Sequence, residues 1–134
     1  MTASPLILVV DDNAAGQLLV TTVLELEGFQ VDTASSSFEV LERLRTRTPD
    51  LILMDVQLPG QDGLSLTRQL KADPATASIR IVALTAYAMP GDREQAIAAG
   101  CAGYITKPID TRNLGDQVRN FLAAEPIEPV EAGD

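Results

Sequence analysis

One stretch, residues 50–63, constrains the fold of this chain more than any other. It contains the apolar run Leu51 to Met54, which ends on the carboxylate of Asp55. Turn-forming residues follow it: Pro59, Gly60 and Gly63. A short apolar run between such breakers is typical of a strand buried on both faces of a parallel sheet. Asp55 would then lie at the strand's carboxyl end, where open α/β sheets place their ligand crevice. Taken alone, it is equally well an ordinary turn residue.

Four further strands alternate with helical segments. The strands are expected over 6–10, 29–34, 79–85 and 103–106. Helices are expected from the cap Asn13 to about Glu27, from one of Ser35, Ser36 and Ser37 to Pro49, from Gly63 to about Ala72, after Pro90 and Gly91 to about Ala99 before Gly100, and from the cap Asp110 or Thr111 onward. Because crossovers between parallel strands require helices, the alternation predicts a doubly wound, five-stranded parallel α/β sheet.

The apolar residues of the first two helices predict which faces pack on the sheet. In the first helix these are Leu19, Val23 and Leu26. In the second they are Phe38, Val40, Leu41 and Leu44. Both sets follow the spacing of one helix face.

The length of 134 residues suits one domain that buries its core without disulfides. Cys101 is the only cysteine, which excludes an internal bridge and indicates a packing residue, and the absence of histidine excludes Ser-His and Cys-His catalysis. The folded domain is expected over 1–124. Residues 125–134 carry two prolines and four acids, too polar a segment to build a core, and are predicted to be disordered.

Charge and hydropathy exclude other classes of protein. The net charge of −9 disfavours nucleic-acid phosphates, and no basic stripe with interleaved aromatic residues is present. No apolar run approaches the roughly 18–20 residues of a membrane span, and the N-terminus lacks the pattern of a signal peptide. We therefore expect a soluble, cytoplasmic protein without membrane insertion.

Chemically active side chains gather at the predicted strand ends. They are Asp11, Asp12, Asp55, Thr85 and Lys107. Three carboxylates converging in one crevice would repel one another, and each would tend to take up a proton. A hard divalent cation resolves this conflict, and Mg²⁺ selects such oxygen ligands. An oxygen nucleophile, a metal, a hydroxyl and a cation are the parts that phosphoryl transfer needs.

Four motifs in this order resemble the receiver domain of two-component response regulators. They are Val-Val-Asp-Asp-Asn (9–13), the segment 51–63, Leu-Thr-Ala (84–86) and Gly-Tyr-Ile-Thr-Lys-Pro (103–108). The resemblance covers about residues 5–123 and implies the flavodoxin-like (βα)₅ receiver fold.

The resemblance also implies a role for each matching residue. Asp55 corresponds to the aspartate that accepts a phosphoryl group. Asp11 and Asp12 correspond to the pair that holds Mg²⁺, completed by Asp55 and the backbone carbonyl of Gln57.

The remaining positions correspond to the groups that respond to the phosphoryl group. Lys107 would pair with it, and Thr85 would turn inward to bond it. Tyr104 corresponds to the aromatic switch residue, and the Lys107–Pro108 bond to one that is cis in the family. Gln57 and Tyr87 flank the approach of a hydrolytic water, and Tyr87 is predicted to slow loss of the phosphoryl group.

By this resemblance the chain is expected to be a stand-alone receiver. It would accept a phosphoryl group from a histidine kinase or a histidine phosphotransfer protein. It would signal to a downstream protein target through its fourth helix, fifth strand and fifth helix, as a monomer or weak dimer. It would assist its own phosphorylation and dephosphorylation without being an enzyme in the ordinary sense.

Three alternatives stand beside this interpretation. A Mg²⁺-dependent phosphatase with an aspartyl-phosphate intermediate would also use Asp55, but its Asp-x-Asp signature is absent from the first strand. A pseudo-receiver that only binds partners would not need the complete set of acids, hydroxyl and lysine. A receiver excised from a hybrid histidine kinase fits as well, because the segment 84–89 resembles both kinds of receiver.

Overall fold

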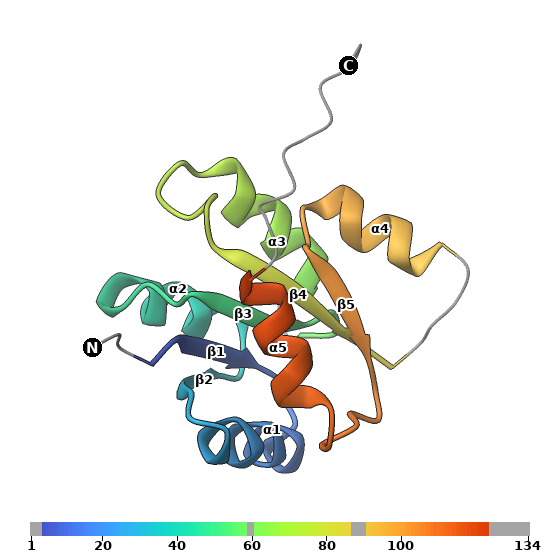
Figure 1. The fold of residues 1–134 in the computed structure, drawn as a ribbon. Helices are drawn as coiled ribbons and strands as arrows, with labels where there is room; N and C mark the ends of the chain where they lie inside the picture. The colour runs from blue at the N-terminus through green and yellow to red at the C-terminus, as the bar shows by residue number, and fades with distance from the viewer. Residues whose placement is uncertain (1–3, 59–60, 87–90, 124–134) are drawn as a thin grey trace.

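Five parallel strands form one sheet at the centre of the molecule (Figure 1). The computed structural model describes residues 4–58, 61–86 and 91–123. The strands are β1 (Leu6–Val10), β2 (Gln30–Ala34), β3 (Leu51–Asp55), β4 (Arg80–Thr85) and β5 (Gly103–Thr106). Their order across the sheet is β2-β1-β3-β4-β5, and every neighbouring pair is parallel. The predicted fold class is confirmed.

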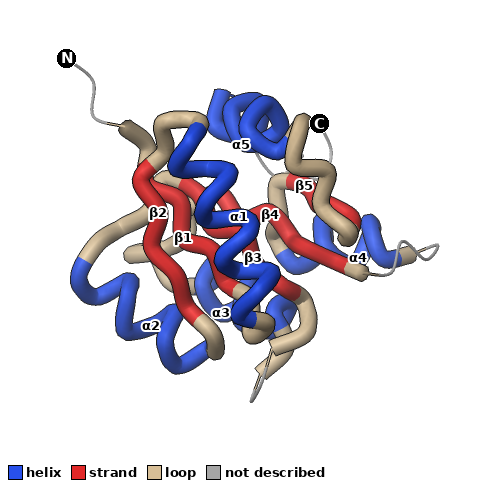
Figure 2. The backbone as a smooth tube through the Cα atoms, turned by 90° about the horizontal axis from the view of Figure 1, so that it is seen from below, coloured by secondary structure: helices blue, strands red, loops and turns tan. Residues whose placement is uncertain are grey.

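Helices cover both faces of this sheet (Figure 2). The helices are α1 (Ala14–Leu26), α2 (Ser37–Thr46), α3 (Gly63–Ala72), α4 (Asp92–Ala99) and α5 (Leu114–Ala123). Buried residues of α1 and α5 share one apolar cluster with the sheet, whereas those of α2, α3 and α4 share the other. Helices on both faces explain why β1 and the run Leu51 to Met54 of β3 are apolar at every position.

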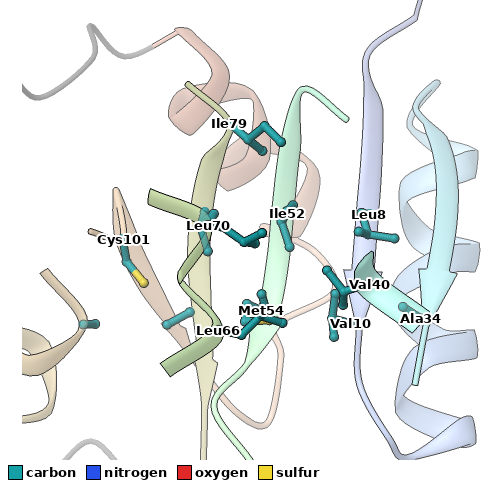
Figure 3. Close-up of a cluster of buried hydrophobic side chains, with 13 residues drawn as sticks. Leu8, Val10, Ala34, Val40, Ile52, Met54, Leu66, Leu70, Ile79 and Cys101 are labelled. Atoms are coloured by element: carbon teal, nitrogen blue, oxygen red, sulfur yellow. The ribbon is translucent and has the colours of Figure 1, made fainter. Parts of the chain in front are cut away.

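The two clusters use alternate residues of each strand. Leu8 and Val10 of β1 belong to the cluster under α2 and α3, which Figure 3 shows in close-up. Ile7 and Val9 belong to the cluster under α1 and α5. Successive side chains of a strand point to opposite faces, so a strand between two helical layers is apolar at every position.

Short polar side chains begin three of the helices. Asn13 accepts a hydrogen bond from the backbone N–H of Gly16, as predicted, and of the three candidate serines it is Ser36 that caps α2 by accepting from Glu39. Asp62 accepts from Ser65 at the start of α3. Such caps satisfy N–H groups that have no partner inside the helix.

The predicted start of α5 at Asp110 or Thr111 is wrong, because the helix begins at Leu114. The Asp110 carboxylate instead accepts from the backbone N–H of Arg112 and the side chain of Asn113. Asp110 therefore closes a turn that precedes the helix, an alternative that its short acceptor side chain favours equally.

The predicted packing faces of α1 and α2 are partly wrong. Leu19 and Leu26 are 48% and 82% exposed, whereas Val20 and Leu24 are buried. On α2, Phe38 is 69% exposed. Apolar residues cover most of the circumference of α1, so their spacing is compatible with more than one buried face. The contacts with the sheet decide between them.

Of the remaining sequence predictions, some fall inside the described residues and some outside them. The Lys107–Pro108 peptide bond is cis, as predicted. Within the described ranges, no helix has the length and apolar character that a membrane span requires. The predicted disorder of 125–134 and the predicted shielding role of Tyr87 fall on residues outside the described part of the chain.

Candidate functional site

The order of the strands brings the predicted site residues to one edge of the sheet. From β1 the chain turns to β2 on one side, while β3 lies on the other side of β1, so the connections change direction between β1 and β3. Val10 of β1 lies beside Met54 of β3, which places the following residues, Asp11 and Asp55, side by side. Open α/β sheets bind ligands at such switch points.

Three carboxylates meet at this point. Asp11, Asp12 and Asp55 each offer one oxygen, and these oxygens all lie within 4.8 Å of one another. Asp11 and Asp55 are buried, whereas Asp12 is exposed to solvent. A cluster of carboxylate oxygens, open to water on one side, suits the hard cation Mg²⁺, which keeps several of its own waters. The residues present therefore fit a magnesium ion.

Lys107 connects the two buried acids. Its Nζ lies 3.2 Å from Oδ2 of Asp11 and 3.0 Å from Oδ2 of Asp55. Burial alone would lower the pKa of Lys107, but its hydrogen bond to Asp55 and the charges of Asp55 and Asp11 outweigh burial and raise that pKa. Lys107 is therefore a fixed positive charge at the site at neutral pH.

Burial dominates the ionisation of Asp55. It raises the pKa of this carboxyl above its ordinary value, although the backbone N–H of Gln57 and the ammonium of Lys107 both act to lower it. Oδ1 of Asp55 accepts the hydrogen bond from Gln57 N at 2.9 Å, while Oδ2 faces Lys107. A partly desolvated carboxylate with one oxygen held by the backbone is well oriented to act as a nucleophile.

Thr85 and Tyr104 lie beside this group and line a pocket of about 290 Å³. Thr85 is buried at the end of β4, and Tyr104 is half-buried on the edge strand β5. The pocket continues between Val56, Ala83 and Ala96. It offers room next to Tyr104 for a side chain to move into.

Gly63 was predicted to form part of a turn and to begin a helix, and the structure shows in addition a close approach of two backbone segments there. A Cβ atom at Gly63 would lie 2.1 Å from the backbone oxygen of Asp55 and 2.9 Å from Cα of Val56. The N–H of Gly63 donates to the carbonyl of Val56 at 2.9 Å. A glycine inside a strand pattern signals such an approach, but Gly63 lies at the start of a helix, so no sequence pattern marks this contact.

Known proteins with similar sequences include response regulators. A family model described as the response regulator receiver domain matches residues 7–119. The polar-differentiation response regulator DivK of Brucella ovis is 37% identical over 116 residues, which make up 87% of this chain and 94% of the relative.

Solved structures with the same fold include receiver domains. The receiver domain of the sensor histidine kinase PA1611 from Pseudomonas aeruginosa, with a magnesium ion coordinated in its active-site cleft, is 32% identical and superposes with a TM-score of 0.81. The match covers 91% of this chain and all of that one. A CheY-like receiver domain protein from Methanospirillum hungatei is 28% identical with a TM-score of 0.80, covering 89% of this chain and 94% of the other.

Proposed function

Because the chain belongs to the response regulator receiver domain family of two-component signalling, we propose that it is a switch that accepts a phosphoryl group on Asp55. The observation that carries this proposal is the bridge of Lys107 to both Asp11 and Asp55 at the switch point of the sheet. Receiver domains are signalling switches, and the chemical step proposed here is confined to the protein's own modification.

In the proposed reaction, a carboxylate oxygen of Asp55 attacks the phosphorus atom of a phosphohistidine. The new P–O bond forms while the P–N bond breaks, and the imidazole nitrogen keeps the bonding electron pair. Asp55 must be ionised to attack, and the Gln57 N–H holds the oxygen that faces away from Lys107. Mg²⁺, held by Asp11, Asp12, Asp55 and the carbonyl of Gln57, would neutralise negative charge on the transferred group.

The proposed switch follows from the charge that arrives. A phosphoryl group adds about −1.5 to −2 charge at neutral pH. Lys107 already faces Oδ2 of Asp55 and would pair with the new oxygens. Thr85 would turn toward them, and Tyr104 would move into the pocket that both residues line. The surface formed by α4, β5 and α5 would change for a downstream protein.

The outward face of α1 is the proposed docking surface for the protein that donates the phosphoryl group. Leu18 and Leu26 are 67% and 82% exposed, and α1 begins two residues after Asp12. A donor must bring its phosphohistidine to Asp55, so a partner helix laid against α1 would reach the site. An exposed apolar stripe next to a reaction site is typical of a protein-binding surface.

The first experiment measures the intact mass after incubation with acetyl phosphate, with and without Mg²⁺. We expect the gain of one phosphoryl group that requires both Mg²⁺ and Asp55, with Asp55→Asn as the matched control. No gain in the wild type, under conditions where Mg²⁺ binding is shown separately, would contradict the proposal and favour a pseudo-receiver. Steady turnover of a generic phosphoester would favour the phosphatase alternative.

A second experiment tests the donor surface. A panel of histidine kinases is first tested to find the one that phosphorylates the wild type fastest. Leu18→Glu should slow transfer from this kinase about tenfold, because a few side chains buried in an interface carry most of its binding energy. Labelling by acetyl phosphate should stay unchanged. Leu26→Glu, the same change two turns farther from Asp12, serves as the control and should have a smaller effect. Equal slowing with both donors would contradict a docking role for Leu18.

Two contexts remain for such a receiver, and each is supported by a relative. DivK is a response regulator whose length is 94% covered by the match, which favours the stand-alone receiver that we propose. The similarity to the receiver domain of PA1611 favours the alternative of a receiver from a hybrid histidine kinase.

A further inference from the structure

We propose that Gln17 is a positioning residue for the metal-binding acids: its side-chain amide fixes the peptide group that joins Asp11 to Asp12. This inference rests on the proposed function, because it takes the acid pair to bind Mg²⁺. Within the described residues, Gln17 makes no hydrogen bond to a carboxylate of the acid cluster, so it would act through the backbone.

The contacts of Gln17 join the ends of two strands. Its Nε2 donates to the backbone oxygen of Asp11 at 3.1 Å and to that of Ala34 at 3.1 Å. The oxygen of Ala34 also accepts from the N–H of Asp11 at 3.1 Å. Both peptide groups that flank Asp11 are therefore tied to the end of β2, one of them through Gln17.

The Asp11 carboxylate has its own supports. Its Oδ1 accepts from the backbone N–H of Asn13 at 2.9 Å, and its Oδ2 accepts from Lys107 at 3.2 Å. The orientation of this side chain would survive the loss of Gln17.

Asp12 differs in this respect. Within the part of the chain that the structure describes, no hydrogen bond or ion pair holds its carboxylate, which is exposed. The direction of the Asp12 side chain therefore depends on its backbone, and the peptide that precedes it carries the carbonyl that Gln17 holds. Groups that orient a metal ligand from outside typically change metal affinity roughly 10–100-fold when they are removed.

A purely structural role makes a different prediction. If Gln17 only attached α1 to the sheet, its loss would lower the melting temperature without a selective effect on Mg²⁺. Gln17→Leu keeps the size and the apolar stem but removes the donor. Gln30→Leu is the matched control, because the Gln30 amide also donates to a backbone oxygen, that of Ser4 at 2.8 Å, next to the opposite ends of the strands.

The test is a calorimetric titration of the full chain with MgCl₂. We expect Gln17→Leu to bind Mg²⁺ about tenfold more weakly than the wild type, at the lower end of the range for such residues. Gln30→Leu should bind like the wild type. In NMR spectra, the Asp12 amide should shift in Gln17→Leu before metal is added, since it belongs to the same peptide group.

Equal Mg²⁺ affinities in the wild type and a folded Gln17→Leu would overturn the inference and leave the proposed function intact. Should Gln17→Leu fail to fold, Gln17→Asn keeps the amide but is one methylene too short to reach both carbonyls, and the same comparison applies to it. Absence of Mg²⁺ binding by the wild type would overturn the metal site and this inference together. Labelling of Asp55 by acetyl phosphate, measured in parallel, shows separately whether the acceptor chemistry stands.

Discussion

At the scale of single residues, the site balances burial against charge. Burial raises the pKa of Asp55, and a neighbouring ammonium only partly offsets that effect. An acid whose pKa is higher in the folded than in the unfolded state binds protons more readily when folded. Its contribution to the free energy of unfolding is therefore largest at low pH and is lost as the pH rises through the raised pKa.

The raised pKa of Asp55 leads to a prediction for the thermal stability of Asp55→Asn in the absence of Mg²⁺. Asparagine has the same shape but no charge to desolvate, so the variant should melt higher than the wild type at pH 7. The difference should shrink as the pH falls through the raised pKa of Asp55, where the wild-type carboxyl takes up its proton. Thermal melts followed by circular dichroism across this range provide the measurement.

Asp62 is a control, because its pKa is shifted in the opposite direction from that of Asp55. Hydrogen bonds from Ser65 at the start of α3 lower its pKa, so its stabilising effect is present at neutral pH and is lost on acidification. Asp62→Ala should therefore destabilise the protein at pH 7 and matter less at low pH. A melting difference for Asp55→Asn that does not change with pH would contradict the role of burial at Asp55.

Cys101 is predicted to be an inert thiol. It is buried in the cluster shown in Figure 3, and burial raises its pKa to about 11. At pH 8 only about one thiol in a thousand would be ionised, and the thiolate is the reactive form. Iodoacetamide should leave the native protein unlabelled and modify it fully in denaturant, as mass spectrometry would show. Rapid labelling of the folded protein would contradict this packing.

At the scale of elements, the turn from β3 to α3 determines where Asp55 lies. The N–H of Val56 donates to Leu84 of β4, and the carbonyl of Val56 accepts from Gly63 of α3. The end of β3 is thus fixed between a strand and a helix. Gly63 allows the two backbones to approach because it has no side chain.

Gly63→Ala should therefore disturb both stability and phosphorylation. Its Cβ would lie 2.1 Å from the Asp55 oxygen, and such overpacking costs typically about 1–3 kcal/mol of unfolding free energy. Chemical denaturation and the rate of labelling by acetyl phosphate provide the two measurements. We expect both values to fall, because the helix and the strand end must move apart.

The control for this variant is Gly28→Ala. Gly28 has a φ of 95°, and a Cβ atom there would meet nothing within 4 Å beyond its chain neighbours. Alanine at this position therefore costs only the left-handed backbone conformation, about 1–2 kcal/mol. Gly28→Ala should lose stability but keep the phosphorylation rate. If both variants kept that rate, the approach at Gly63 would not control the position of Asp55.

At the scale of the whole molecule, the chain carries a net charge of −9. Three of its acids are held together at one edge of the sheet, where their repulsion opposes folding. A cation that binds only the folded state should stabilise the whole domain.

Mg²⁺ at 100 times its dissociation constant should add about 2.7 kcal/mol to the free energy of unfolding. For a domain of this size, that increase corresponds to a rise in melting temperature of roughly 10 °C. EDTA should reverse the rise, and Asp12→Asn should show much less of it. An equal rise with NaCl at the same ionic strength would indicate general screening of charge and contradict a specific site.

The sequence by itself determined the fold class and the positions of the acids along it. Apolar runs such as 51–54 form buried strands because of local composition, and Asp55 is the last residue of its strand in any fold that contains it. Tertiary structure decided the contacts between distant residues. Lys107 meets Asp11 and Asp55 across separations of 96 and 52 residues because the parallel strands β1, β3 and β5 all end at the same edge of the sheet.

The buried face of α1 was also a tertiary decision. Apolar residues cover most of the circumference of this helix, so its own sequence is compatible with burying either Leu19 or Val20, and only packing against the sheet and α5 selects Val20. The bonds of Gln17 and the approach of Gly63 arise in the same way. They join segments that become neighbours only when the sheet assembles. The atoms contacted belong to the backbone, which every residue has, so the sequence does not indicate which of them will be contacted.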